Sequence, residues 1–359
     1  MKYVKWLFLS LFSVLQGCDE NSNKPNEPES TAIEVRAADI SFLPAIRNAG
    51  TQFKNASGEV KDVLTILKEA GCNTIRLRLW HSPETTHSGL DEVEAFTEEL
   101  RNFGFDIWLT VHYSDTWADP GTQTKPEAWK DLSLTDLKDS VYNYTKKIVT
   151  LLNPEYIQIG NEINGGLLWP DGQIDNRDNF IQLLKEGSKA VRDASASTKI
   201  MMHYAGITGA DWFYNELKTH AVDYDIIALS YYPRWHEKSL DVVRNSLTGL
   251  ANNFDKDIIL AETGYPFTLQ WNDWTNNLVG LTEHLINGYP ATEKGQHDFM
   301  MQLRKIMHDT PRGLGLAYWA PEWVAYKGEE ATDGSPWENM ALFDFNFQAL
   351  DAMEVFKEE

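Results

Sequence analysis

The sequence predicts an α/β fold, a single (β/α)8 TIM barrel, and two observations lead to that prediction. Eight short apolar runs alternate with longer amphipathic stretches from about residue 33 onward, and polar or aromatic residues directly follow nearly every run. Strands that alternate with helices are typical of a parallel sheet, and eight such units close into a barrel. The alternation has no internal repeat or linker, so we expect one domain over residues 33–359.

The predicted strands are short runs rich in Ile, Leu, Val and Ala, which is typical of strands buried on both faces. They cover residues 35–38, 74–79, 107–111, 156–159, 199–202, 226–229, 258–261 and 314–318. Between them, residues 60–70 place Val63, Ile66, Leu67 and Ala70 on one helical face. The same spacing predicts helices over 134–152, 180–194 and 296–307.

Polar and aromatic residues gather where the predicted strands end. Arg76 and Arg78 lie within the second strand, and the later strands are followed by His112–Tyr113, Asn161–Glu162, His203, Ser230–Tyr231–Tyr232, Glu262–Thr263 and Trp319. Active sites of TIM barrels are built at the carboxyl ends of the strands. We therefore expect these side chains to converge on one site.

Two glutamates at these strand ends suit glycosidic bond cleavage. Residues after strands four and seven face each other across a barrel mouth, which pairs Glu162 with Glu262. Such a reaction needs a proton donor for the departing oxygen and a carboxylate facing the anomeric carbon. The plain alternative for either residue is a solvated carboxylate without a role.

The neighbours of the two glutamates suggest different roles for them. Tyr231 or Tyr232 could donate a hydrogen bond to Glu262, and Arg76 or Arg78 could favour its ionised form. Glu162 would be protonated at rest, because the negative charge of Glu262 raises its pKa. The hypothesis is that Glu162 is the general acid/base and Glu262 the nucleophile.

Composition restricts the class of ligand. The chain carries a formal net charge of -21, which disfavours nucleic acid and polyanionic substrates but not a neutral one. Its 13 Trp residues either fill the core or stack on the flat faces of sugar rings, and composition does not decide between these.

The N-terminal residues resemble an exported lipoprotein. Lys2 and Lys5 precede the apolar run 6–15, which is too short for a permanent membrane span, and Gly17–Cys18 follows it like a bacterial lipobox. We expect a signal peptide over 1–17, a lipid on Cys18, a flexible tether over 18–32, and a place at the outer membrane or cell surface. The alternative is an ordinary secretory signal with an incidental Cys. Cys72 would then have no disulfide partner, and we expect it to be buried.

Several longer motifs resemble one known family. They are RLRLW at 76–80, VHYSDTWADPGTQTKPEAW at 111–129, QIGNEINGGLLWPDG at 158–172, SYYPRWH at 230–236, ETGYPFT at 262–268 and YWAPEW at 318–323. Together they resemble glycoside hydrolase family 53, the endo-β-1,4-galactanases, over nearly the whole mature chain. The resemblance implies endo-cleavage of neutral β-1,4-galactan with retention, and it gives Glu162 and Glu262 the same two roles.

The resemblance also implies sugar contacts on the barrel rim. It points to Asp39, His112, Trp117, Asn161, Trp169, Trp235, Trp319 and Asp344. The strand ends and the long motif add Arg76, Asp115, His203, Tyr231 and Tyr232 to the candidate substrate-binding residues. For Trp117, Trp169 and Trp235 the alternative is an aromatic residue that only shapes the groove.

Some bacterial members of this family carry calcium in the long loop after strand seven. Their ligands resemble Asp273 and Asn277, whereas Trp271 and Thr275 replace two further ligands. Backbone oxygens, Asp333 or Ser335 could complete a shell, since calcium needs 6–8 oxygen ligands. The alternative is a loop held by packing of Trp271 and Trp274.

Two rival functions remain open from sequence alone. One is another retaining β-glycanase on the same barrel, such as a mannanase, xylanase or cellulase, which would use the same glutamates. The other is a non-catalytic glycan-binding lipoprotein, which would need the aromatic residues but not the carboxylate pair. In every case we expect a monomer that needs no cofactor for its chemistry, with no nucleic-acid partner and membrane contact only through its lipid.

Overall fold

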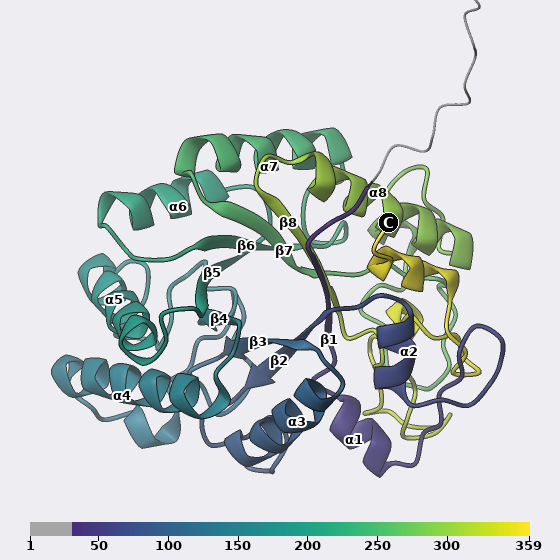
Figure 1. Cartoon of the computed structure of the whole chain (residues 1–359), viewed down its shortest axis with the longest axis horizontal. Helices are drawn as coiled ribbons and strands as arrows, with labels where there is room; N and C mark the ends of the chain where they lie inside the picture. The colour runs from purple at the N-terminus through teal and green to yellow at the C-terminus, as the bar shows by residue number, and fades with distance from the viewer. Residues whose placement is uncertain (1–30) are drawn as a thin grey trace, which may run out of the picture. The chain divides into compact units, whose positions relative to one another are not determined.

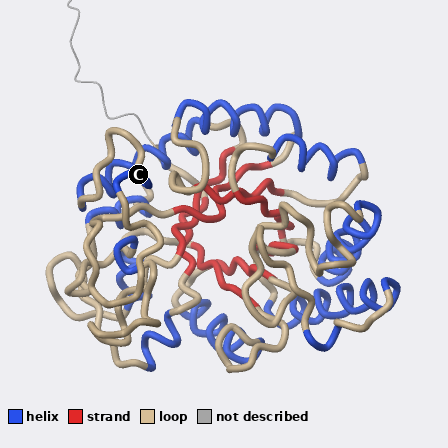
Figure 2. The backbone as a smooth tube through the Cα atoms, turned by 180° about the vertical axis from the view of Figure 1, so that it is seen from behind, coloured by secondary structure: helices blue, strands red, loops and turns tan. Residues whose placement is uncertain are grey.

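A computed structural model of the chain describes residues 31–359, which form a closed barrel of eight parallel strands (Figure 1). The strands are hydrogen-bonded in chain order, and β1 (Val35–Asp39) pairs with β8 (Gly313–Trp319) to close the ring. Figure 2 shows the strands as a central ring with the helices outside it. The predicted single TIM barrel is confirmed.

The remaining elements follow one another around this ring. The other strands are β2 (Thr74–Leu79), β3 (Asp106–Val111), β4 (Tyr156–Ile159), β5 (Lys199–Ala205), β6 (Ile226–Tyr231) and β7 (Asp257–Thr263). The α-helices are α1 (Leu43–Asn48), α2 (Val63–Glu69), α3 (Leu90–Asn102), α4 (Leu134–Leu152), α5 (Arg177–Ala194), α6 (Ala210–Thr219), α7 (Leu240–Phe254) and α8 (Glu293–Asp309). Short 3-10 helices cover Glu127–Trp129, Thr282–His284, Glu338–Met340 and Asp351–Phe356.

The longest helix shows how the sequence sets its own ends. Ser133 precedes α4, and its hydroxyl accepts a hydrogen bond from the amide of Asp136, as an N-cap does. Asn153 ends the helix in the left-handed conformation, with φ of 42°. Between these residues one apolar face is buried, so the predicted bounds of 134–152 are those observed.

The core has two parts, because the side chains of a strand point alternately to its two faces. Small and apolar residues fill the inside of the barrel, among them Ala37, Trp108, Met201 and Ala228. A larger cluster fills the space between the strands and the helices, and it includes Cys72, which is buried as predicted. The inward positions become polar toward the carboxyl ends of the strands, where the site lies.

Strand β7 carries a bulge just before one of the predicted catalytic residues. Leu260 pairs with Leu229, but the next pair joins Glu262 to Ser230, so Ala261 is an extra residue. A bulge re-aims the side chains that follow it. Here it brings Glu262 into line with Ser230 and turns its side chain toward the pocket.

The N-terminal predictions fall largely outside this structure. The signal peptide over 1–17, Cys18 and the tether up to residue 30 lie outside the described residues. Within residues 31–359, no helix combines enough length and hydropathy to cross a membrane.

Candidate active site

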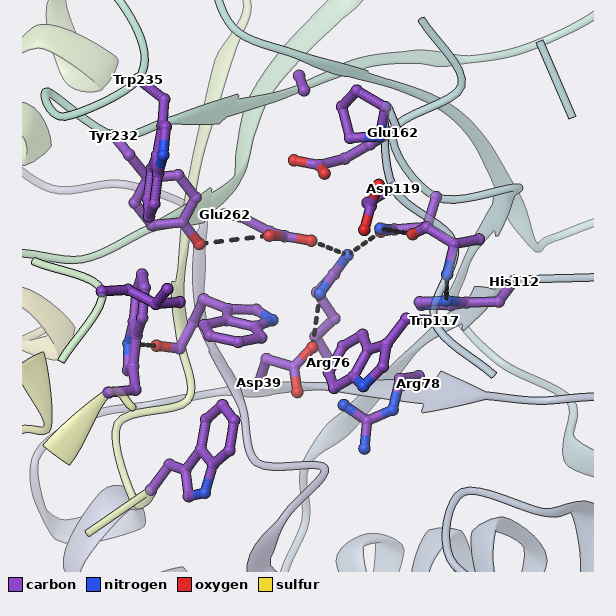
Figure 3. A pocket seen from close by; sticks show the side chains of 18 of the residues that line it. Asp39, Arg76, Arg78, His112, Trp117, Asp119, Glu162, Tyr232, Trp235 and Glu262 are labelled. Atoms are coloured by element: carbon purple, nitrogen blue, oxygen red, sulfur yellow. Dashed lines mark hydrogen bonds and ion pairs between the residues drawn. The ribbon is translucent and has the colours of Figure 1, made fainter. Parts of the chain in front are cut away.

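The carboxyl ends of the strands surround a pocket of about 550 Å³ (Figure 3). Aromatic rings and a few charged groups make up most of its wall. The lining residues are Asp39, Arg76, Arg78, His112, Trp117, Ala118, Asp119, Pro120, Asn161, Glu162, Ala205, Tyr232, Trp235, His236, Glu262, Leu278, Trp319, Trp323 and Trp337.

The buried guanidinium of Arg76 connects four strands at the floor of this pocket. Its Nη2 donates to Glu262 Oε1 at 2.7 Å and to Asn161 Oδ1 at 2.9 Å. Nη1 donates to Asp39 Oδ2 at 2.5 Å, and Nε donates to Gln158 Oε1 at 2.9 Å. One buried cation therefore fixes two carboxylates, Asp39 and Glu262, and two side-chain amides. Hydrogen bonds in which a partner is charged are stronger than those between neutral groups.

Glu262 lies between Arg76 and a tyrosine. The hydroxyl of Tyr232 donates to Glu262 Oε2 at 3.3 Å, so each carboxylate oxygen accepts one hydrogen bond. Burial raises the pKa of the Glu262 carboxyl, whereas Arg76 and Tyr232 act in the opposite direction by stabilising its charged form. Of the sequence alternatives, Arg76 and Tyr232 are the residues that contact Glu262.

The backbone of Glu162 adopts an uncommon conformation. Its φ is 48°, in the left-handed region that non-glycine residues seldom occupy. Hydrogen bonds hold the segment on both sides: the amide of Ile163 donates to the His203 carbonyl at 2.9 Å, and Gln123 donates to the Asn161 carbonyl at 2.8 Å. Strain of this sort is often found where a side chain must point into a site.

The two glutamates are close together and electrostatically different. An oxygen of Glu162 and an oxygen of Glu262 lie within 4.8 Å of each other. Burial and the charge of Glu262 raise the pKa of Glu162 to about 8. The protonated form is therefore favoured at Glu162, whereas the hydrogen bonds from Arg76 and Tyr232 favour the charged form of Glu262. The separation fits the spacing of about 5–5.5 Å used by retaining glycosidases and not the wider spacing of inverting ones.

A metal ion is not needed to explain this cluster. Glu162, His203 and Glu262 are the one set of three or more His, Cys, Asp or Glu side chains with metal-ligand spacing in residues 31–359. Arg76 already compensates the charge of Glu262, and Ser230 donates to Glu162 Oε1 at 2.5 Å.

Aromatic residues make up the rim on both sides of the carboxylates. Trp117 and Trp235 are 36% and 46% exposed, and Figure 3 places them on opposite sides of Glu262. Arg78 lies 4.1 Å from the centre of the Trp117 ring, a cation–π contact that holds this ring from behind. Trp235 stacks parallel to Trp337, with ring centres 6.3 Å apart.

Most of the sequence-predicted residues meet at this pocket. Those that line it are Glu162, Glu262, Asp39, Arg76, His112, Trp117, Asn161, Tyr232, Trp235 and Trp319. His203 is fully buried and lies behind the pocket, where Nε2 contacts Ser230 Oγ at 2.9 Å. Burial lowers the pKa of both His112 and His203 well below the ordinary value, so both are neutral at pH 7.

Four predicted substrate contacts do not line the pocket. Asp115 accepts hydrogen bonds from the amides of Ser82 and Glu127, and Asp344 closes a turn by accepting from Asn346 and Gln348. Tyr231 points away and donates to the Glu237 carbonyl, and Trp169 donates to the Gly165 carbonyl. These four side chains make contacts within loops or packing, and the structure does not place them in the pocket wall.

Two lining residues and one buried residue behind the pocket were missed by the sequence interpretation. Trp323 and Trp337 line the pocket from the long connection that follows β8. Gln158 does not line it but had a usable signal, because it occupies an inward position of β4. That alternation was available in the sequence and points into the barrel.

The loop after β7 brings the predicted metal ligands together with an unpredicted carboxylate. Asp273 and Asn277 are buried, and Glu338 Oε1 accepts hydrogen bonds from the amides of Asn272 and Asp273. Among residues 31–359, Asn277 Oδ1 and Glu338 Oε2 are buried oxygens without a hydrogen-bond partner. No ion pair within residues 31–359 includes Asp273 or Glu338, so two buried carboxylates lie here without a cationic side chain.

The other residues that the sequence offered for this loop make different contacts. Trp271 and Trp274 are 50% and 62% exposed, so their packing does not hold the loop. Asp333 forms an ion pair with Lys327 at the surface, and Ser335 Oγ donates to the Trp323 carbonyl. Thr275 joins the loop to its neighbour, because its hydroxyl accepts from the amide of Gly334.

Comparison with known proteins agrees with this geometry. Residues 35–356 match the sequence profile described as Glycosyl hydrolase family 53. The chain is 32% identical over 347 residues to Arabinogalactan endo-beta-1,4-galactanase A of Aspergillus niger, which covers 92% of this chain and 96% of the relative.

Solved structures show the same relationship. The Ignisphaera aggregans GH53 catalytic domain superposes with a TM-score of 0.87 at 37% identity, over 93% of this chain and 98% of that one. The endo-1,4-beta-xylanase XylE of Penicillium canescens superposes with a TM-score of 0.58 at 17% identity, over 88% of this chain and 97% of that one. The second likeness concerns the fold alone.

Proposed function

The chain belongs to glycosyl hydrolase family 53, and from that premise we propose that it is a retaining endo-β-1,4-galactanase acting on the galactan side chains of pectin and arabinogalactan. The observation that carries the proposal is the asymmetric carboxylate pair. Glu162 and Glu262 lie within 4.8 Å of each other, yet the cation Arg76 is hydrogen-bonded to Glu262 and not to Glu162. One group is therefore prepared to donate a proton and the other to attack.

The reaction proceeds in two displacements. In the first, Glu262 bonds to the anomeric carbon while the glycosidic bond breaks, and the departing oxygen takes the proton of Glu162. In the second, Glu162 removes a proton from water, which attacks the anomeric carbon and displaces Glu262. Configuration is inverted twice and so retained. Asn161, which is fixed by Arg76 and by the Ala118 carbonyl, is positioned to bond a sugar hydroxyl beside the reacting carbon.

The wall of the pocket supports a neutral polysaccharide that extends in both directions. Exposed Trp117 and Trp235 offer flat faces on opposite sides of the reaction centre, where successive sugar rings could stack. A chain bound across both sides is cut internally, as an endo-acting enzyme does. The pocket is complete within one chain, which supports action as a monomer.

The substrate is tested by product analysis. The purified protein is incubated separately with unbranched β-1,4-galactan, mannan, xylan and cellulose, and products are separated by chromatography. We expect short galacto-oligosaccharides from galactan and little product from the others. Equal or better activity on mannan or xylan would favour the rival glycanases, and binding without any hydrolysis would favour the non-catalytic alternative.

A structural calcium ion is part of the proposal. Asp273, Asn277 and Glu338 would hold it, and the support is their burial, their unbalanced negative charge and the two unpartnered oxygens of Asn277 and Glu338. Oxygen ligands of this type suit calcium. The ion would cross-link the loop after β7 to the loop after β8, and it would take no part in the chemistry.

Export and anchoring complete the proposal. Gly17–Cys18 after the apolar run 6–15 supports cleavage before Cys18 and a lipid on that residue. A lipid-anchored enzyme at the outer membrane or cell surface would meet a polysaccharide that is too large to enter the cell.

A further inference from the structure

The acid/base glutamate is the last member of a line of buried polar groups. Ser230 Oγ lies 2.5 Å from Glu162 Oε1, His203 Nε2 lies 2.9 Å from Ser230 Oγ, and His203 Nδ1 lies 2.8 Å from Gln158 Nε2. We propose that Gln158, His203 and Ser230 form a one-directional hydrogen-bond chain that keeps the transferable proton of Glu162 on Oε2. All three would be positioning residues, since none of them lines the pocket.

The direction of the chain is set first at Gln158. Its Oε1 accepts from Arg76 Nε, Trp108 Nε1 and Thr110 Oγ1, at 2.9, 2.7 and 3.0 Å. The guanidinium and the indole nitrogen can only donate. This atom must therefore be the oxygen, and the atom facing His203 must be the NH2 group, which donates.

The tautomer of His203 follows from its neighbours. Nδ1 faces two donors, Gln158 Nε2 at 2.8 Å and the backbone amide of Glu162 at 3.2 Å. Asn161 Oδ1 also lies near Nδ1, at 3.1 Å, but the Gln158 NH2 group is closer to Nδ1 and can only donate to it. A hydrogen on Nδ1 would point among two N–H groups, so Nδ1 is the bare nitrogen. The imidazole is neutral, because burial and Arg76 lower its pKa, and its one hydrogen is therefore on Nε2.

The last two links follow from this tautomer. Nε2–H donates to Ser230 Oγ, so the single hydroxyl hydrogen of Ser230 is free to donate to Glu162 Oε1. Oε1 is then an acceptor in both protonation states of Glu162. The acidic proton is carried by Oε2, the oxygen that remains for the glycosidic oxygen and later for water.

The hydrogen-bond chain also lowers the pKa of Glu162, which burial and neighbouring carboxylates raise. The charged and titratable groups that act on this carboxyl are Glu262, Asp119, Arg76, His203 and Tyr232. Glu262 and Asp119 raise its pKa, whereas the hydrogen bond from Ser230 lowers it by stabilising the carboxylate. A base is needed in the second displacement, so the Ser230 hydroxyl keeps the proton removable.

The first experiment is Ser230→Ala, with the pH dependence of kcat/KM on β-1,4-galactan as the readout. Without the hydrogen bond from Ser230, the pKa of Glu162 should rise. The alkaline limb of the kcat/KM profile should therefore move to higher pH by about one pH unit. At pH 6, kcat should fall several-fold with little change in KM, because water is activated less well. A limb that moves to lower pH would show that the hydroxyl accepts from Glu162, the opposite direction, and an unmoved limb would show no coupling. Either result overturns the proposal.

The matched control is Ser188→Ala. Ser188 is a buried serine on α5 whose hydroxyl has no hydrogen-bond partner in the part of the chain that the structure describes. This substitution deletes one buried hydroxyl that is not part of the hydrogen-bond chain, so the pH profile should stay that of the native protein. An equal shift in this control would overturn the assignment to Ser230.

The second experiment needs neither a variant nor a substrate. Long-range proton–nitrogen NMR spectra of the native protein, labelled with ¹⁵N in histidine, report which nitrogen of each neutral imidazole carries hydrogen. We expect the Nε2–H tautomer for His203, and Nδ1–H would overturn the proposal. The inference rests on the proposed role of Glu162: absent glycosidase activity in the native protein defeats that role, whereas the wrong tautomer defeats the chain alone.

Discussion

Arg76 Nη2 lies 2.7 Å from Glu262 Oε1, and this contact joins a buried cation to one of the two carboxylates, Glu262, and not to Glu162. Both side chains are buried, so water screens the contact little. The same guanidinium pairs with Asp39. The contact therefore sets the charge of the site and also contributes to the stability of the barrel.

Replacing Arg76 should change the acid side of the pH profile. Arg76→Met removes the charge that lowers the pKa of Glu262, so ionisation of the nucleophile requires a higher pH and the acid limb of kcat/KM moves up. The free energy of unfolding should fall by about 3–5 kcal/mol, because the buried carboxylates of Asp39 and Glu262 lose their cationic partner. Urea unfolding and pH–rate profiles measure both effects. Arg76→Lys is the control, since it keeps the charge but not the four-way contact, and an acid limb as displaced as that of Arg76→Met would contradict a charge effect.

Removal of the nucleophile should be rescued by a small anion. Glu262→Ala leaves a gap beside the anomeric carbon, and azide entering this gap should yield an α-galactosyl azide from an aryl galactoside with a good leaving group. Product configuration is measured by NMR. A β-azide from this variant would show that the two roles are reversed.

Removal of the acid/base should have a different signature. Glu162→Ala should lose most activity on galactan, whose leaving oxygen needs a proton, and keep a fast first step on an activated aryl substrate. Azide should then accelerate the second step and give the β-azide. Rates near those of the native protein on galactan in both variants would contradict the whole mechanism.

The raised pKa of Glu162 also predicts a dependence of stability on pH. The folded protein holds this proton up to about pH 8, whereas the unfolded chain releases it near the ordinary pKa of about 4.3. Between these values the folded state binds more protons, so this group lowers stability as pH rises. Glu162→Gln should therefore raise Tm by a few degrees at pH 7.5 and by less at pH 4.5. An equal gain at both pH values would point to packing instead of ionisation.

Chelation should reveal the proposed calcium ion. A ligand that binds only the folded state adds stability, so EDTA should lower Tm and added calcium should restore it. Asn277→Ala should have the low Tm already and respond little to EDTA, whereas Thr268→Ala, on the same long connection, should respond as the native protein does. An unchanged Tm with chelator would mean that Asp273 and Glu338 are buried without a metal.

Anchoring is tested at Cys18. Cys18→Ala removes the one proposed lipid site, so the protein should leave the membrane fraction or retain its signal peptide. Cys72→Ala is the matched control, because that cysteine is buried in the core. Unchanged fractionation of Cys18→Ala with membranes would contradict the lipobox interpretation.

The sequence predicted the barrel and its catalytic pair because both depend on local order. Strand runs and the residues that end them are adjacent in the chain, so Glu162 and Glu262 could be placed by counting strands. Trp323, Trp337 and Glu338 come from the long loops after β8, whose path depends on contacts remote in sequence. The place of Asp115 and Asp344 outside the pocket could not be predicted for a related reason: a motif names a carboxylate but does not say whether it faces the pocket or accepts hydrogen bonds within a loop.

The bulge in β7 makes the nucleophile depend on a backbone irregularity. Leu260 and Leu229 pair and both face the helices, and Glu262 aligns with Ser230 because Ala261 is accommodated as an extra residue. If Ala261 instead paired with Ser230 in a regular ladder, strand alternation would direct Glu262 toward the helices. The tryptophans of the rim come from other segments, so carbohydrate binding and hydrolysis could be separated by the register of one strand, with no change to the sugar-contacting surface.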